Sequence, residues 1–164
     1  MPKDHELKMK KMEEISTRTA VLADLPILYE FEQGIIKAER PYDETLKPGH
    51  INYYDIKAMI ESTESEVIVA VLKTEIIGSA YLDIKQAKPY LKYKSFAYLG
   101  FMYVKPAYRG KGVSNIIIEK IKKLARAKNV NELHLDVYND NHSAISAYEK
   151  AGFKRNLINM RIEI

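Results

Sequence analysis

A basic, glycine-containing turn between two apolar segments is the part of the sequence best suited to bind an anion. The turn follows a β-like run that ends at Val104, and residues 109–112 read Arg-Gly-Lys-Gly. The first amides of a helix lack intrahelical acceptors and lie at the positive end of its dipole, so glycines that expose the backbone favour a phosphate cradle. Arg109 and Lys111 add full charges. A turn with no ligand is the alternative interpretation.

The known nucleotide motifs do not fit this turn. It lacks the Gly-x-x-x-x-Gly-Lys-Ser/Thr pattern of a P-loop, and Asn115 stands where the third glycine of a dinucleotide fingerprint would be. We therefore expect a different diphosphate ligand.

A second candidate segment runs from residue 141 to residue 153. Asn141 and Tyr148 are seven residues apart, or two helical turns, so they share one helix face with the small residues Ala144 and Ala151. A phenol on that face, next to a bound thioester, could protonate the departing thiolate. The alternative is a core tyrosine whose hydroxyl donates to a backbone carbonyl.

The composition excludes several other chemistries. The chain has no cysteine, so disulfides, thiolate zinc sites and cysteine nucleophiles are ruled out. No two of its four histidines have the spacing of paired metal ligands, and we expect no metal site. The histidines are His5, His50, His134 and His142.

Positive charge is concentrated in one stretch. Residues 105–128 contain eight Lys and Arg against Glu119 alone, a local charge of +7, which leaves the remainder of the chain at 18 minus 21, or −3. A local field of this kind favours one polyanionic ligand at one place over a long nucleic-acid surface.

The length of 164 residues, 46% of them hydrophobic, predicts one domain with one sizeable core. We expect residues 1–14 to be a charged lead-in and residues 15–164 to be the domain. The first fourteen residues contain no apolar run suited to a secretory signal. The longest apolar run, 67–72, is far below the about 20 residues that a membrane span needs. We expect a soluble, cytoplasmic protein.

Hydrophobic periodicity and turn residues predict elements in the order β-α-α-β-β-β-α-β-α-β-β. Such an order is typical of a mixed α+β layer structure. The helix that follows Gly112 should bury a stripe that includes Val113 and Ile117. The predicted strands are 15–21, 67–72, 76–84, 96–104 and 133–138, with one or two more over 153–164. The predicted helices start at Asp24 (ending at Gly34 or Pro41), span 51–62, follow Gly112, and span 139–151.

The two segments together resemble the GNAT superfamily of N-acetyltransferases. Its acetyl-CoA motif is Arg/Gln-x-x-Gly-x-Gly/Ala, and Arg109, Gly112 and Ser114 occupy the three defined positions. Ser114 departs from the motif because it adds a side chain. The resemblance spans essentially residues 15–164. It also covers Val104 and Pro106 of the lead-in and, downstream, Asn141, Ala144, Tyr148, Gly152 and Phe153.

The resemblance implies a GNAT-like, largely antiparallel sheet flanked by helices, with the fourth and fifth strands splayed to admit acetyl-CoA as co-substrate. Tyr148 would be the general acid, and a main-chain N–H near Met102 would stabilise the oxyanion. Transfer to a primary amine would be direct, in a ternary complex. The implied cofactor-binding residues are Met102, Tyr103, Val104, Arg109, Gly110, Lys111, Gly112, Val113, Ser114 and Asn141.

The general base is not fixed by the motifs. Asp136 is the first candidate because it lies on the fifth strand close to the cofactor gap, although a carboxylate at a strand edge is often simply solvated or paired. Asp83, Glu32 and Glu39 follow. The loop over 39–42, with Tyr81 and Tyr98, would line the acceptor pocket. The twelve tyrosines among sixteen aromatic residues suggest an amphipathic groove.

The sequence leaves the acceptor open: an aminoglycoside, polyamine, amino acid, protein N-terminus or lysine could fit. Two other functions also remain, because fold does not settle function. One is a non-catalytic module that holds nucleic acid on its basic helix. The other is a CoA-binding domain without transfer chemistry. We expect acetyl-CoA and an amine as partners and no membrane; a nucleic acid is disfavoured, and a homodimer is left open.

Overall fold

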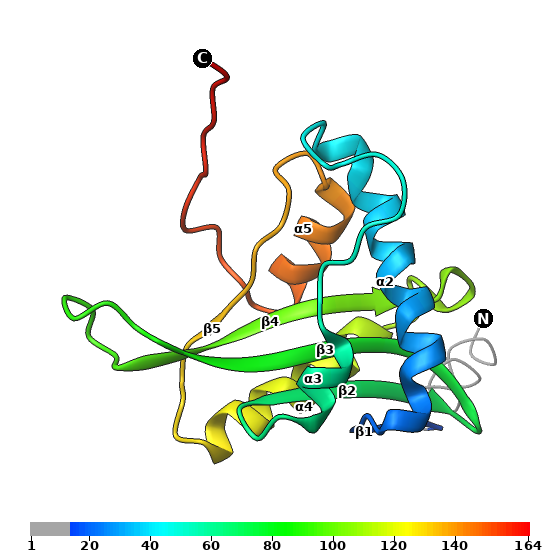
Figure 1. The fold of residues 1–164 in the computed structure, drawn as a ribbon. Helices are drawn as coiled ribbons and strands as arrows, with labels where there is room; N and C mark the ends of the chain where they lie inside the picture. Colours follow the sequence, from blue (N-terminus) through cyan, green and yellow to red (C-terminus); the bar gives the residue numbers. More distant parts are fainter. Residues whose placement is uncertain (1–13) are drawn as a thin grey trace, which may run out of the picture.

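The computed structural model describes residues 14–164, so the predicted lead-in lies, apart from Glu14, outside the described residues. One five-stranded sheet carries helices on both faces (Figure 1). The strands are β1 (Ile15–Thr19), β2 (Ser65–Leu72), β3 (Glu75–Gln86), β4 (Ser95–Val104) and β5 (Leu133–His134). The helices are α2 (Leu25–Glu39), α3 (Ile56–Glu61), α4 (Val113–Ala127) and α5 (His142–Lys150). Short 3-10 helices span Leu22–Asp24, Arg40–Tyr42 and Pro106–Tyr108.

The strands follow chain order across the sheet, from β1 to β5. Neighbours are antiparallel except β4 and β5, which are parallel. The β4–β5 ladder has two pairs, Ala97 with Leu133 and Tyr98 with His134, while β4 continues to Val104. The predicted mixed sheet with splayed fourth and fifth strands is therefore confirmed.

Two apolar cores lie on opposite faces of the sheet. Along β2, Ile68 and Ala70 pack in the core beneath α4, whereas Val67 and Val69 pack in the core beneath α2 and α3. Successive side chains of a strand point to opposite faces, so this one apolar run serves both cores. The helices on each face thereby fix the position of the central strands.

The strongest helix prediction is confirmed in α4. Val113, Ile117 and Ile121 of the predicted stripe are fully buried, and Leu124 is half-buried at the edge of the same core. The predicted hairpin is also confirmed: β2 and β3 are antiparallel neighbours that close with the pair Leu72 and Glu75.

The predicted helix over 51–62 is too long at its start, because α3 begins at Ile56. The backbone amides of Tyr53 and Tyr54 donate to Glu32 Oε1, at 2.7 and 2.8 Å, which holds that stretch against α2. Asp55 then caps α3 by accepting from the amide of Ala58. A buried carboxylate on a distant helix thus overrides local helical periodicity.

Of the two strand predictions near the C-terminus, one is too long and the other is wrong. Only Leu133–His134 of the predicted strand 133–138 forms a ladder, because β4 and the chain after His134 diverge. No strand forms over 153–164, where the chain runs out from the base of α5 (Figure 1). A strand needs a neighbour for its hydrogen bonds, and this segment has none within residues 14–164.

Among the described residues, no helix is both long enough and apolar enough to cross a membrane.

Candidate active site

The turn between β4 and α4 has the geometry of an anion cradle. Gly110 and Gly112 have φ values of 70° and 82°, a region that favours glycine, and Gly112 is the N-cap of α4. The first helix amide that donates to a backbone carbonyl is that of Ile116, at 3.1 Å from the oxygen of Gly112. The amides of residues 113–115 precede it and are available to a ligand.

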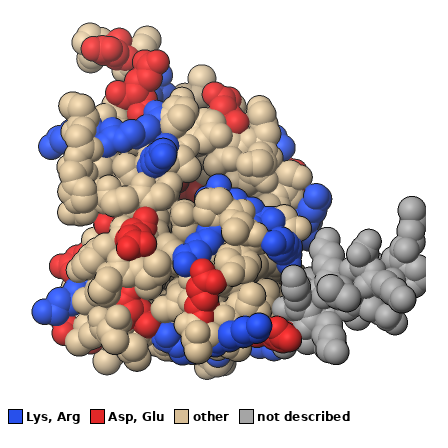
Figure 2. Space-filling model, turned by 90° about the vertical axis from the view of Figure 1, so that its right-hand side faces the viewer, with Lys and Arg blue, Asp and Glu red and all other residues tan. Residues whose placement is uncertain are grey.

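Two cations flank these amides. The Arg109 Nε donates to the carbonyl of Val104 at 2.9 Å, and its guanidinium carbon lies 5.6 Å from the ring centroid of Tyr103. Lys111 Nζ donates to the carbonyl of Ala107 at 2.6 Å. The face of the molecule that shows the end of β4 has Lys and Arg side chains near its centre (Figure 2). The structure therefore brings the predicted phosphate-binding residues together, with Ser114 half-buried beside them.

A bulge in β4 redirects the strand just before the predicted oxyanion position. The register shifts so that Phe101 and Met102 both lie opposite Ala80, and Phe101 has a φ of 54°. A non-glycine residue in that region is strained, and such residues persist where the surroundings hold them. Here the buried Ser79 hydroxyl donates to the Phe101 carbonyl at 3.1 Å. Sequence reasoning missed this bulge, because no turn residue occupies position 101.

Helix α2 packs against Tyr103, the residue of β4 that follows the bulge. A Cβ on Gly34 would lie 2.6 Å from Cε2 of Tyr103, so only glycine allows the present contact between this helix and the ring. Phe31 adds an aromatic contact, with ring centroids 4.6 Å apart. The Tyr103 ring thus packs between α2 and Arg109. The one sequence signal for this contact is Gly34, a glycine inside a helix.

Helix α5 packs Tyr148 against the core on the α4 face of the sheet. Met102 of β4 and Leu135 after β5 lie at the edge of the same core. Burial, with a smaller contribution from the charge of Glu39, raises the pKa of the Tyr148 phenol to about 12. The phenol therefore carries its proton at neutral pH. Asn141 caps α5 through Oδ1, which accepts from the Ala144 amide at 3.3 Å, so its side-chain NH₂ is the group left to donate to a cofactor.

The predicted base lies across the gap between the splayed strands. The Tyr98 hydroxyl of β4 donates to Asp136 Oδ2 at 3.0 Å, which bridges β4 and the chain after β5. Burial, and then the charge of Asp136, raise the pKa of Tyr98. Asp136 itself is exposed, so an acceptor could reach it.

Glu39 lies on the same side, at the C-terminal end of α2. Burial is the main cause that raises the pKa of its half-buried carboxyl. Burial is the main cause that raises the pKa values of Tyr53, Tyr138 and Tyr148, and the charge of Glu39 is a smaller one. Glu39 is therefore near enough to these three phenols for its charge to act on them.

Sequence reasoning missed Asp43, which accepts hydrogen bonds from residues far away in the chain. Its carboxylate accepts from the Tyr138 hydroxyl at 3.1 Å and from Arg161 at 3.1 Å. Hydrogen bonds from Thr45 and Arg161 hold its pKa well below the usual range. Asp43 joins the loop after α2 to the chain after β5, and the only local sequence signal is the Asp-x-Thr turn.

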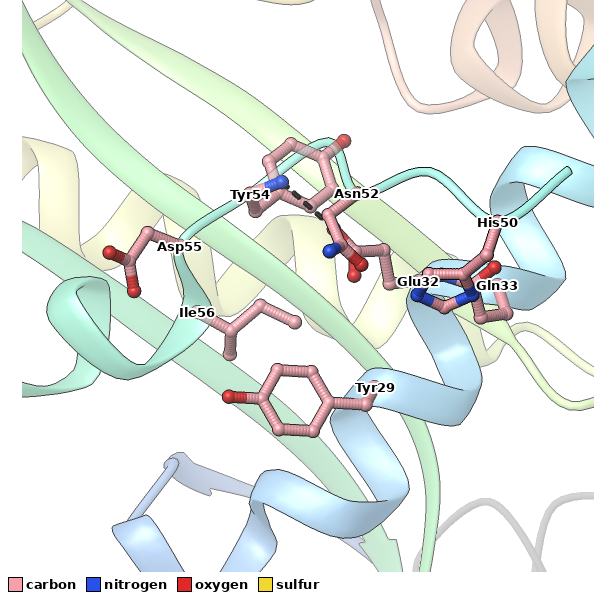
Figure 3. A pocket seen from close by; sticks show the side chains of 8 residues that line it. All are labelled: Tyr29, Glu32, Gln33, His50, Asn52, Tyr54, Asp55 and Ile56. Atoms are coloured by element: carbon pink, nitrogen blue, oxygen red, sulfur yellow. Dashed lines mark hydrogen bonds between the residues drawn. The ribbon is translucent and has the colours of Figure 1, made fainter. Parts of the chain in front are cut away.

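The two remaining base candidates are placed elsewhere. Glu32 is buried and accepts from two backbone amides of the 51–55 stretch. It lines a separate pocket of about 580 Å³ between α2 and that stretch (Figure 3). The pocket contains none of the predicted cofactor residues. Asp83 on β3 accepts from Ser65 at 3.4 Å. Within residues 14–164 no group of three or more His, Asp or Glu side chains has the arrangement of a metal site.

The splayed strands and the basic turn before α4 lie at one end of the sheet, and comparison with known proteins gives the family of the chain. Residues 31–153 match the Acetyltransferase (GNAT) family, and because this is well over half of the chain, the protein belongs to that family.

Similar proteins agree with this membership. The acetyltransferase SG1711 of Sodalis glossinidius is 29% identical over 125 residues, which are 76% of this chain and 81% of that protein. The solved structure of a BH1408 tetramutant from Bacillus halodurans has a TM-score of 0.82 at 20% identity, covering 91% of this chain and 99% of that one. A predicted acetyltransferase from Clostridium acetobutylicum, solved with acetyl-CoA, has a TM-score of 0.70 at 18% identity, covering 91% and 96%.

Proposed function

We propose that this protein is an N-acetyltransferase that moves an acetyl group from acetyl-CoA directly to a primary amine, on a small molecule or a peptide, within a ternary complex. The observation that carries the proposal is the pairing of two features at the splayed strands. An amide cradle lies at the end of β4, and a protonated phenol on α5 packs near the same strand. The transfer chemistry is assigned to one domain, residues 15–164.

The cradle suits the diphosphate of acetyl-CoA. Its helix-terminal amides and its two cations are the donor set that phosphate oxygens need, and positive charge at a helix N-terminus favours an anion. The Clostridium acetobutylicum neighbour was crystallised with acetyl-CoA, which supports this ligand. In the proposal Met102, Tyr103 and Val104 pair with the pantetheine arm, Arg109 to Ser114 hold the diphosphate, and Asn141 donates to the cofactor. Among these, Val113 contributes its backbone amide only, because its side chain is buried.

The reaction requires two proton transfers. The amine nitrogen attacks the thioester carbonyl, whose developing oxyanion accepts from the amide near Met102, and the carbon–sulfur bond then breaks. Tyr148 gives its proton to the departing thiolate, and a carboxylate takes a proton from the amine. The proposed base is Asp136, which reaches both the solvent and the gap.

Glu39 is a second candidate for the base. A half-buried carboxylate with a raised pKa that faces Tyr148 is a stronger proton acceptor than an ordinary glutamate. The acceptor amine would then enter between α2 and the chain after β5.

We further propose that the protein acts in the cytoplasm and as a homodimer.

Binding and turnover test the proposal separately. CoA should raise the melting temperature of the protein through ligand linkage, and duplex or single-stranded nucleic acid should not. A panel of primary amines with acetyl-CoA should then release free thiol. A protein that CoA does not stabilise contradicts the cofactor assignment. Stabilisation without thiol release from any amine would favour a CoA-binding domain that lacks transfer chemistry.

A further inference from the structure

A buried carboxylate oxygen without a partner lies in the wall of the pocket between α2 and the 51–55 stretch. Glu32 is only 1% exposed. Its Oε1 accepts from the amides of Tyr53 and Tyr54, whereas its Oε2 has no hydrogen-bond partner within residues 14–164. A buried acceptor that is left unpaired costs folding free energy. In the wall of a pocket, such an oxygen therefore indicates a ligand that brings a donor.

The pocket around this oxygen has the size and the rigid wall of a small-molecule site. Its volume of about 580 Å³ lies within the range of roughly 300–1,000 Å³ that ligand pockets span. Gln33 Nε2 donates to the carbonyl of Ile51 at 2.9 Å, and the amides of Tyr53 and Tyr54 donate to Glu32. These bonds hold the 51–55 stretch on α2 before any ligand enters, so binding orders little of the chain.

The side chains that line the pocket favour a cation. Glu32 and Asp55 bring two carboxylates, and the described lining contains neither Lys nor Arg, although the whole chain has a net charge of +4. Tyr29 and Tyr54 add aromatic rings, whose faces attract cations, and Ile56 adds an apolar side chain (Figure 3). An anion would be repelled by the two carboxylates, and a ligand without a donor would leave the buried oxygen unpaired.

The unpaired oxygen also selects the kind of cation. A primary ammonium carries three N–H donors, whereas a quaternary ammonium has the same charge and no donor. We propose that this pocket is a binding site for a primary alkylammonium ligand. Its ammonium group donates to Glu32 Oε2, and its alkyl chain lies against Ile56 and the ring of Tyr29.

This site is separate from the site of the proposed acetyl transfer. The described residues that line it include none of those proposed to hold the cofactor or to line the acceptor groove. The nearest link is Tyr54, whose ring contacts Phe101 and Tyr81 with centroids 5.2 and 5.6 Å apart. The ligand is therefore a second amine and not the acceptor. Its binding goes beyond the proposed function and can be measured without acetyl-CoA.

Titration of the full chain with pentylammonium, followed by the amide signals in NMR spectra, tests the site directly. The amides of Tyr53, Tyr54 and Ile56 should shift and reach saturation. Pentyltrimethylammonium has the same chain and charge without an N–H, so it should bind about tenfold more weakly or worse. Equal affinity for the two ligands overturns the hydrogen bond to Glu32. Shifts that occur only around Asp136 would show that the amine binds in the acceptor groove alone, which also overturns the inference.

Two variants and a matched control assign the binding to the pocket. Glu32→Gln keeps an oxygen for the two backbone amides but removes the charge, so it should weaken pentylammonium binding about tenfold or more. Glu30→Gln changes an exposed carboxylate of α2 outside the lining and should leave the affinity unchanged. Asp55→Asn keeps the cap oxygen that accepts from Ala58 and should weaken binding severalfold, which preserves the test if Glu32→Gln does not fold. An affinity that neither lining variant lowers overturns the inference.

Discussion

The proposed cofactor side and the proposed acceptor side of the splayed strands are built by different means. On the cofactor side, residues 109–115 bring glycines, cations and helix amides together within one turn. On the acceptor side, Glu39, Asp43, Asp136 and Tyr138 come from α2, the following loop and the chain after β5. Backbone recognition needs few contiguous residues, whereas side-chain recognition collects groups from distant segments.

Because of this difference, the two sides suit different kinds of ligand. A backbone cradle suits the constant part of a ligand, which in our proposal is a diphosphate, because every residue supplies the same amide. The acceptor side instead has phenols and carboxylates with pKa values shifted by burial and by each other. The specificity for the acceptor should therefore depend on these side chains, which can be substituted without altering the backbone cradle.

The largest expected effect is on the cradle. Gly112→Asp should abolish CoA binding, because the residue has a φ of 82° and the change adds a negative charge among the phosphate-binding amides. Calorimetric titration with CoA measures this loss. Gly112→Ala is the matched control: it brings the same strain at a φ of 82° but no negative charge, so it should weaken binding less. Unchanged affinity in Gly112→Asp places the diphosphate elsewhere.

The next effect separates chemistry from binding. Tyr148→Phe should lower kcat by about 100-fold or more, the usual range for loss of a general acid, while the affinity for acetyl-CoA stays within about twofold. Thiol release and calorimetry measure the two quantities. Tyr108→Phe is the control, because that hydroxyl donates to Glu75 outside the gap. If both variants turn over like wild type, Tyr148 is not the acid.

The same contrast explains which parts of the site could be predicted from sequence. The cradle could be predicted because its physics is local: Arg109, Gly112 and the amphipathic α4 are contiguous. The bulge at Phe101 could not, because its positive φ depends on a hydrogen bond from Ser79, 22 residues away. The contacts of Asp43 could not be predicted either, because its partners Tyr138 and Arg161 are distant in sequence.

The fold shows the same limit. The order of strands and helices is confirmed as far as α5, because core periodicity is a local signal. The start of α3 was predicted wrongly since Glu32, on another helix, takes the amides of Tyr53 and Tyr54. Over residues 153–164 the alternation predicts a strand, but a strand also requires a neighbour, and a single sequence cannot specify one.

A pH profile sharpens the acceptor side. Asp136→Asn should lower kcat/KM for the amine about 100-fold or more, the low end of what general bases contribute. Glu39→Gln should leave the acid limb of the profile in place. If Glu39 is the base instead, activity falls as pH decreases through its raised pKa, and the limb starts at higher pH than for an ordinary carboxyl. If Glu39→Gln loses the acid limb of the pH profile while Asp136→Asn stays active, Glu39 and not Asp136 is the general base.

The smallest expected effect lies between the two sides, at the bulge. Ser79→Ala removes the buried hydrogen bond to the Phe101 carbonyl and should cost about 1 kcal/mol of unfolding free energy, measured by denaturant titration. The released strain should also misplace the Met102 amide, so kcat should fall a fewfold while CoA affinity is kept. Ser65→Ala is the control, because its 3.4 Å bond to Asp83 lies away from the bulge and its loss should leave kcat unchanged. Equal kcat in both variants would mean that the bulge is held by packing alone, through Phe101 and Tyr54, whose ring centroids are 5.2 Å apart.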